Sequence, residues 1–195
     1  MELDAPGIDT VIYEPSRTPN SVTRVIGLAT LLAIGAGALM LVCECVAEAA
    51  RPAPWWIAIV VAVGFGLAER FVFHIEYRRE AITFSMSEVP TAFALVFLSP
   101  VVAVGVRVVV SLIVIAVTSR PAAYKLVFNG ALFAFETALA FTLVRTVVSP
   151  ESVDDGWMLL AIAGGAVVAT LAGSIVVSMA IAAFEGRFRD ASFAS

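Results

Sequence analysis

The charged residues Arg107 and Glu136 and the amide Asn129 lie inside long apolar segments of the sequence. A charged side chain inside a membrane is costly, so such residues usually pair with each other or serve a function. Arg107 precedes Pro121 by 14 residues, and Glu136 follows it by 15. If a turn near Pro121 joins two antiparallel helices, both side chains lie at one depth, about 20 Å from that turn. We therefore predict that Arg107 and Glu136 interact.

This predicted pair has two interpretations, and the sequence leaves both open. In the first, an ion pair only fixes the register of two facing helices. In the second, Arg107, Asn129 and Glu136 anchor a small-molecule cavity, because Asn129 lies two turns from Glu136 on the same helix face. Ser111 and Thr118 share the face of Arg107 and extend this polar seam. A third possibility is that the two helices do not face each other.

The second interpretation predicts a ligand-binding site that opens to the outer side of the membrane. Its walls combine aromatic, aliphatic and polar side chains, a mixture typical of ligand sites. The residues predicted to form these walls, besides the three anchors, are Phe84, Met86, Glu88 and Phe133. An arginine at this depth favours an anionic ligand unless Glu136 already neutralises it.

The composition of the sequence predicts that membrane helices position these residues. Hydrophobic residues make up 61% and charged residues 14% of the 195 residues, against about half and a quarter in an average soluble domain. Six apolar segments stand out, at residues 25–43, 55–73, 89–98, 101–118, 126–148 and 157–184. We predict an all-α integral membrane protein, a bundle of about six transmembrane helices with a short or broken third helix. Residues 1–23 form a cytoplasmic tail, 24–184 the bundle, and 185–195 a cytoplasmic tail or a linker to a missing output domain.

The third apolar segment, residues 89–98, is too short to cross a membrane. Ten residues span about 15 Å as a helix, half of the hydrocarbon thickness. Residues 82–87 alternate between apolar and polar types, the period of an extended chain. Ser87 suits the N-cap of the following helix, with Glu88 in its first turn. We expect a short helix preceded by extended chain that is partly sunk into the bundle. The alternative is one tilted helix over residues 81–98.

The distribution of basic residues predicts the orientation. With a cytoplasmic N-terminus, nine Lys and Arg residues fall on the inner side and two on the outer side. This bias predicts a multi-pass protein of the cell membrane with both termini in the cytoplasm. Trp55, Trp56 and Trp157 then begin spans at the outer interface, where indole rings prefer to lie. The first apolar run is longer than the core of a signal peptide, so we expect an uncleaved helix.

Other candidate sites are weak in this sequence. Cys43 and Cys45 point in different directions on a helix, so we expect neither a disulfide nor a metal site. The chain shows no catalytic motif, implies no cofactor, and has no basic cluster for nucleic acid. Expected partners are the lipid bilayer and a small molecule. In the last span, small residues recur every four positions at Gly165, Ala169 and Gly173, a ridge that lets helices approach closely.

Several motifs together resemble a known family. They are HIEYRREA at 74–81, FSMSEVP at 84–90, Ser99-Pro100, and KLVFN at 125–129 followed by Phe133. They resemble the N-terminal multi-span sensor modules of bacterial cyclic-di-GMP signalling proteins, which precede GGDEF, EAL or HD-type output domains. The similar region covers roughly residues 70–148. The chain stops at Ser195, where an output domain would begin.

The resemblance implies a function in signal transduction at the bacterial inner membrane. The module would bind a small ligand and relay the signal to a cytoplasmic domain of the diguanylate cyclase or phosphodiesterase type, or act within a homodimer. Any enzymatic activity would lie in that absent domain. The densest polar run is either a solvated loop with its arginines at lipid headgroups or the relay element. Its candidate relay residues are His74, Glu76, Arg78 and Arg79.

Two further interpretations stay open. Six hydrophobic helices with one broken segment also resemble the substrate-binding membrane subunits of vitamin transporters. Such a subunit would hold a small solute in the same polar seam and dock an energising partner, often through a small-residue ridge. The third interpretation is a structural membrane protein without a ligand.

Overall fold

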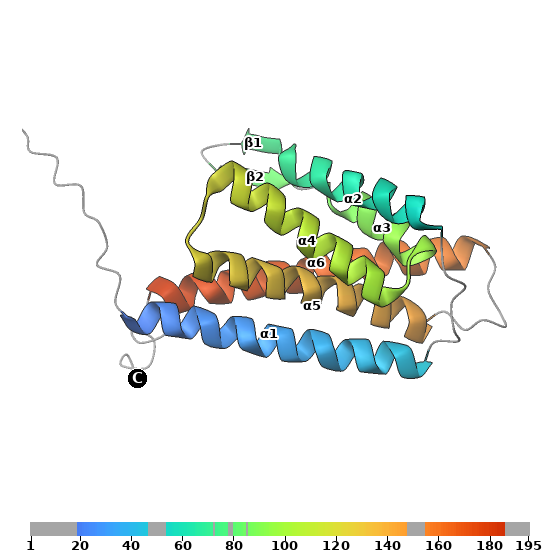
Figure 1. Cartoon of the computed structure of the whole chain (residues 1–195), viewed down its shortest axis with the longest axis horizontal. Helices are drawn as coiled ribbons and strands as arrows, with labels where there is room; N and C mark the ends of the chain where they lie inside the picture. Colours follow the sequence, from blue (N-terminus) through green and yellow to red (C-terminus); the bar gives the residue numbers. More distant parts are fainter. Residues whose placement is uncertain are drawn as a thin grey trace, which may run out of the picture.

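The computed structural model describes residues 19–46, 54–71, 73–77, 80–84, 86–147 and 155–185. These ranges hold six helices and one antiparallel pair of strands (Figure 1). The helices are α1 (Pro19–Val46), α2 (Trp55–Arg70), α3 (Glu88–Phe97), α4 (Pro100–Ser119), α5 (Ala123–Val147) and α6 (Asp155–Glu185). The strands are β1 (Phe73–Tyr77) and β2 (Glu80–Phe84). The predicted helical bundle with a short third helix is confirmed. Residues 1–18 and 186–195, which hold most of the two predicted tails, lie outside the described residues.

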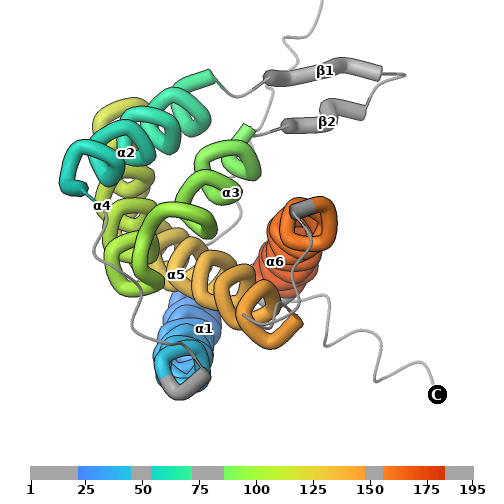
Figure 2. Tube along the Cα trace, turned by 90° about the vertical axis from the view of Figure 1, so that its right-hand side faces the viewer, coloured from blue at the N-terminus to red at the C-terminus, as the bar shows by residue number. Residues whose placement is uncertain are grey.

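Helix α5 lies at the centre of the bundle. Helices α1, α4 and α6 all pack against it, and α3 also reaches it (Figure 2). Helix α2 packs on α3 and α4, on the side of α5 away from α1. One apolar cluster, with Phe65 and Phe141 fully buried, joins α2, α3, α4 and α5 and includes Cys43 of α1. A second cluster, which includes Ala29 and Leu132, joins α1, α5 and α6.

Four helices in the described part of the chain, α1, α4, α5 and α6, are long and apolar enough to cross a membrane. Helix α2 has 16 residues and α3 has 10, so they extend about 24 and 15 Å, less than the hydrocarbon core of about 30 Å. Large apolar side chains such as Leu31, Leu159 and Leu171 are exposed on the outer faces. Such a surface suits lipid rather than water, so the chain is a helical membrane protein.

The stretch before α3 is extended, as one of the two interpretations predicted. Strand β2 pairs antiparallel with β1, in a register that sets Phe73 opposite Phe84 and Tyr77 opposite Glu80. A single tilted helix over 81–98 is therefore wrong. The pairing with β1 was not predicted, because residues 73–77 were assigned to the end of the second span and the loop that follows. The side chains of residues 72–85 lie outside the described residues, so the predicted depth of this stretch stays a prediction.

Short connections hold α3, α4 and α5 side by side. Helix α3 ends at Phe97, and α4 begins with Pro100 in its first turn after Ser99 at the N-cap. Helix α4 ends at Ser119, and its C-cap Arg120 has a left-handed φ of 43°. Pro121 follows, which cannot continue a helix. Since α5 starts at Ala123, α4 and α5 form the antiparallel pair that the sequence predicted.

The small-residue ridge of α6 packs against α5. A Cβ placed on Gly165 would lie 2.8 Å from Val144 Cγ2, and Ala169 is buried. A Cβ placed on Gly173 would overlap the carboxylate of Glu136. The ridge therefore lets α6 approach α5 closely within the bundle.

Candidate ligand-binding pocket

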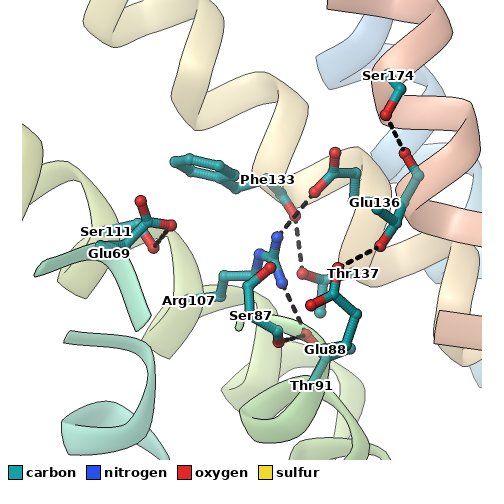
Figure 3. Close-up of polar contacts among 11 residues, drawn as sticks. Glu69, Ser87, Glu88, Thr91, Arg107, Ser111, Phe133, Glu136, Thr137 and Ser174 are labelled. Atoms are coloured by element: carbon teal, nitrogen blue, oxygen red, sulfur yellow. Dashed lines mark hydrogen bonds and ion pairs between the residues drawn. The ribbon is translucent and has the colours of Figure 1, made fainter. Parts of the chain in front are cut away.

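The predicted interaction between Arg107 and Glu136 is present. Arg107 Nη2 donates a hydrogen bond to Glu136 Oε2 at 2.8 Å, and the two side chains are only 6% and 14% exposed (Figure 3). The α4–α5 pair places them at one depth, as the equal offsets from Pro121 predicted. The ion pair satisfies two charges that would be costly to leave alone in a membrane.

Two further helices hold the guanidinium of Arg107. Its Nη1 donates to Thr91 Oγ1 of α3 at 2.7 Å. Its Cζ lies 5.2 Å from the ring centroid of Phe65 in α2 and 5.4 Å from that of Phe133 in α5, within the range of cation–π attraction. The third nitrogen, Nε, is buried and has no hydrogen-bond partner among the described residues. Arg107 is therefore fixed by contacts from α2, α3 and α5.

Two more carboxylates lie near this pair, and each accepts a hydrogen bond from a hydroxyl group. Ser111, one turn after Arg107 in α4, donates to Glu69 Oε1 at 3.2 Å (Figure 3). Thr170 of α6 donates to Glu88 Oε1 at 3.3 Å. These contacts extend the polar cluster from α2 across to α6.

A pocket of about 510 Å³ opens beside the ion pair. This volume falls in the range of small-molecule sites, about 300 to 1,000 Å³. Polar and charged residues predominate in its wall, which is formed by Glu69, Ser87, Glu88, Arg107, Phe133, Glu136, Thr170, Gly173, Ser174 and Val177. The ion pair therefore borders a pocket with several polar lining residues, and not only packed side chains.

The structure brings together four of the seven residues predicted to contact a ligand. Arg107, Glu136, Glu88 and Phe133 all line the pocket. Asn129 does not line it, and its side chain has no hydrogen-bond partner in the described part of the chain. Seven residues separate Asn129 from Glu136, so it lies about 10 Å farther along the same helix face.

The other residues predicted for the pocket or the polar seam either do not line this pocket or have side chains outside the described residues. Met86 lines a separate apolar groove between α2 and α3. Thr118 is exposed and donates to the carbonyl of Val114 in its own helix. The side chains of Phe84 and of the four predicted relay residues lie outside the described residues.

The pocket lies toward the side that the charge bias assigns to the cytoplasm. Glu69 is the last residue but one of α2, Glu88 begins α3, and Val177 lies eight residues before the end of α6. This orientation rests on the charge bias alone, so the predicted opening to the outer side stays a prediction.

Sequence reasoning missed Glu69, Thr91, Thr170 and Ser174. A signal was available for Glu69, since it is a carboxylate within the second apolar segment and is costly there for the same reason as Glu136. Hydroxyl groups give a weaker signal, because they often bond to their own helix. Ser174, for example, donates to the carbonyl of Thr170, and this pattern occurs without any function.

Comparisons with protein-family models, with curated proteins and with solved structures found no match.

Proposed function

We propose that this chain is a membrane-embedded sensory or regulatory module, which binds a small ligand in the pocket beside Arg107 and Glu136. The observation that carries the proposal is the pocket itself, because a dry, packed ion pair would serve only to fix helix register. The relay to a cytoplasmic domain of the diguanylate cyclase or phosphodiesterase type comes from the sequence resemblance.

Helix α6 gives this proposal a physical route for the signal. It contributes Thr170, Gly173, Ser174 and Val177 to the pocket and continues to Glu185. A shift of the helix at Ser174 is carried about 16 Å along its axis to that end. If α6 can take two positions, a ligand that binds one of them more tightly increases the fraction of molecules with α6 in that position.

The alternative function is a substrate-binding subunit of a vitamin-like transporter, which would use the same pocket. Such a subunit needs a surface for its energising partner. The small-residue ridge of α6, the feature expected to serve this purpose, packs against Val144 and Glu136 of α5 instead. This packing favours the sensory function over the transport function.

Blocking the pocket tests ligand binding. Ser174 lines the pocket, and a Phe at this position fills the space without changing any charge. A bound ligand stabilises the wild type by about 2.7 kcal/mol at 100 times its Kd. We expect Ser174→Phe to lose this gain when the purified protein is heated with a library of small metabolites.

The matched control is Ser178→Phe, one turn later on α6 and outside the pocket. This variant should respond to the same compounds as the wild type. The proposal fails if no compound stabilises the wild type, or if Ser174→Phe is stabilised equally.

The proposed orientation places both termini in the cytoplasm. Reporter fusions at Ser195 should then be active as cytoplasmic reporters, and fusions within residues 149–156 as external ones. The reason is the nine-to-two excess of basic residues on the inner side. If only α1, α4, α5 and α6 cross the membrane, the termini and residues 149–156 lie on the same sides as with six spans. This requires that α2 and α3 enter and leave the membrane on one side. An external reporter signal at Ser195 would contradict the orientation.

A further inference from the structure

The first turn of α3 forms part of the pocket wall, through Ser87 and Glu88. Ser87 is the N-cap residue of this helix, as the sequence predicted, but its side chain makes no capping hydrogen bond. A helix start that lacks a side-chain cap is less stable than one that has it. The order of this turn therefore depends more strongly on contacts from the rest of the bundle.

Thr91 connects this turn to the ion pair (Figure 3). Its Oγ1 donates a hydrogen bond to the carbonyl of Ser87 at 2.7 Å and accepts one from Arg107 Nη1, also at 2.7 Å. A hydroxyl group has one proton. Because that proton goes to Ser87, the oxygen is left to accept from Arg107, which also donates to Glu136. One continuous chain of hydrogen bonds thus joins Glu136 of α5 to the start of α3.

The links of this chain are buried. Ser87 is 8% exposed, and Thr91 and Arg107 are each 5% exposed. Hydrogen bonds in a site that excludes water are stronger and influence one another more than those at a surface. A bond from a threonine to its own helix is common, so the bond from Arg107 is what distinguishes Thr91. Thr137 of α5, for example, is also buried and donates to the carbonyl of Phe133, but no charged group in the described part of the chain bonds to its oxygen.

We propose that Thr91 is a positioning residue, which makes the order of the first turn of α3 depend on the Arg107–Glu136 ion pair. The inference rests on the proposed function, because it concerns how the pocket regulates the rest of the chain. A ligand that alters the ion pair changes the hydrogen bond to Thr91, and this change reaches the helix start through the carbonyl of Ser87.

The start of α3 adjoins the strand pair that holds part of the predicted relay element. Strand β2 ends at Phe84, three residues before Ser87, and it pairs with β1. Strand β1 contains His74 and Glu76, two of the four predicted relay residues. A change in the first turn of α3 therefore acts directly on the junction between β2 and the bundle.

Helix α6 offers a competing route from the ion pair to the same turn. A Cβ at Gly173 would overlap the carboxylate of Glu136, and Thr170 of α6 donates to Glu88 at 3.3 Å. This bond is longer than the two 2.7 Å bonds of Thr91, and Thr170 is exposed. Since longer hydrogen bonds are weaker, we expect the route through Thr91 to carry the larger effect.

Hydrogen exchange of single amides measures the order of this turn, because the exchange rate follows the free energy of local opening. The N–H of Val89 donates to the carbonyl of Met86 at 3.3 Å in the first turn of α3. Its exchange is followed by NMR on the full chain in detergent micelles. Glu136→Leu should accelerate it about fivefold, the change that corresponds to one hydrogen bond. The N–H of Ile57, which donates to Pro54 at the equally uncapped start of α2, should not respond.

Variants at Thr91 then identify the route. Thr91→Val removes the hydroxyl and keeps the size of the side chain. It should accelerate exchange at Val89 about fivefold by itself, and Glu136→Leu should then add nothing. Thr91→Ser keeps the hydroxyl and should restore both the slow exchange and the response to Glu136→Leu. Thr137→Val is the matched control, because Thr137 is buried and bonds to its own helix in the same way. In this background the full response to Glu136→Leu should persist.

Two results overturn the inference without touching ligand binding. Equal acceleration by Glu136→Leu in the wild-type and Thr91→Val backgrounds would assign the coupling to α6. No response at Val89, or an equal one at Ile57, would show that the ion pair does not act on this turn specifically. If Glu136→Leu does not fold, Glu136→Gln replaces it with the same expected pattern. These measurements need no ligand, so their failure leaves the proposed function standing, whereas the Ser174→Phe experiment tests that function alone.

Discussion

Arg107→Ala and Glu136→Ala should each lower the free energy of unfolding by about 3 to 5 kcal/mol, because each leaves the partner charge buried and unpaired. Water defects and displacement of the long side chain toward the interface reduce this cost in lipid. The Arg107 variant also loses the hydrogen bond to Thr91 and the contacts with the rings of Phe65 and Phe133. It should therefore be the more damaging of the two.

The double variant Arg107→Ala/Glu136→Ala shows whether the two residues act as one ion pair or contribute to stability independently. Removing both charges leaves neither one unpaired, so its cost should be well below the sum of the single costs. The measurement is reversible unfolding of the purified protein in mild detergent. Lys125→Ala, at an exposed position near the start of α5, is the control for loss of a charge. Single costs below about 1 kcal/mol, or strict additivity in the double variant, would show that the pair is not energetically coupled.

The second large effect is expected at Gly173. A Cβ at this position overlaps the carboxylate of Glu136, so Gly173→Ala must displace either that carboxylate or helix α6. Overpacking of this kind typically costs about 1 to 3 kcal/mol. The variant should also weaken ligand binding, since Gly173 and Glu136 both line the pocket.

Gly164→Ala is the matched control on the same helix. No neighbouring atom lies within 4 Å of a Cβ at this position, and alanine is the better helix former. This variant should be neutral or slightly stabilising. In a Glu136→Ala background, the cost of Gly173→Ala should disappear, because the atoms that it overlaps are gone. An equal cost in both backgrounds would mean that Gly173 acts through packing unrelated to the ion pair.

The α4–α5 pair and its ion pair could be predicted from the sequence because the geometry is local. Two helices joined by a short turn at Pro121 are antiparallel neighbours, and a constant rise per residue converts sequence offsets into depth. The same reasoning failed for Asn129. Two residues on one helix face can lie at different depths. Asn129 precedes Glu136 by seven residues, so its side chain lies about 10 Å along the helix from the pocket.

The positions of Glu69 and Glu88 could not be derived in the same way. Helix α2 reaches α3 through the β1–β2 pair, which did not follow from the sequence pattern of residues 73–77. The depth of α2 relative to α4 is therefore set by tertiary packing, such as the contact between Gly66 and Val110. For this reason the sequence analysis did not place Glu69 beside the ion pair, although the observed pocket wall contains it.

The central claim is that an open polar pocket, and not a dry core, surrounds Arg107 and Glu136. Thiol accessibility tests it most directly, with Thr170→Cys in a background of Cys43→Ala and Cys45→Ala, treated in native membranes with a water-soluble thiol reagent. Leu171→Cys is the control, because Leu171 follows Thr170 directly on α6, is exposed on the outer surface and lies outside this pocket. A thiol reacts as its thiolate, which forms in water and not in lipid. The account predicts that Thr170→Cys reacts at least about tenfold faster than Leu171→Cys. Equal and negligible reaction at both positions would contradict it.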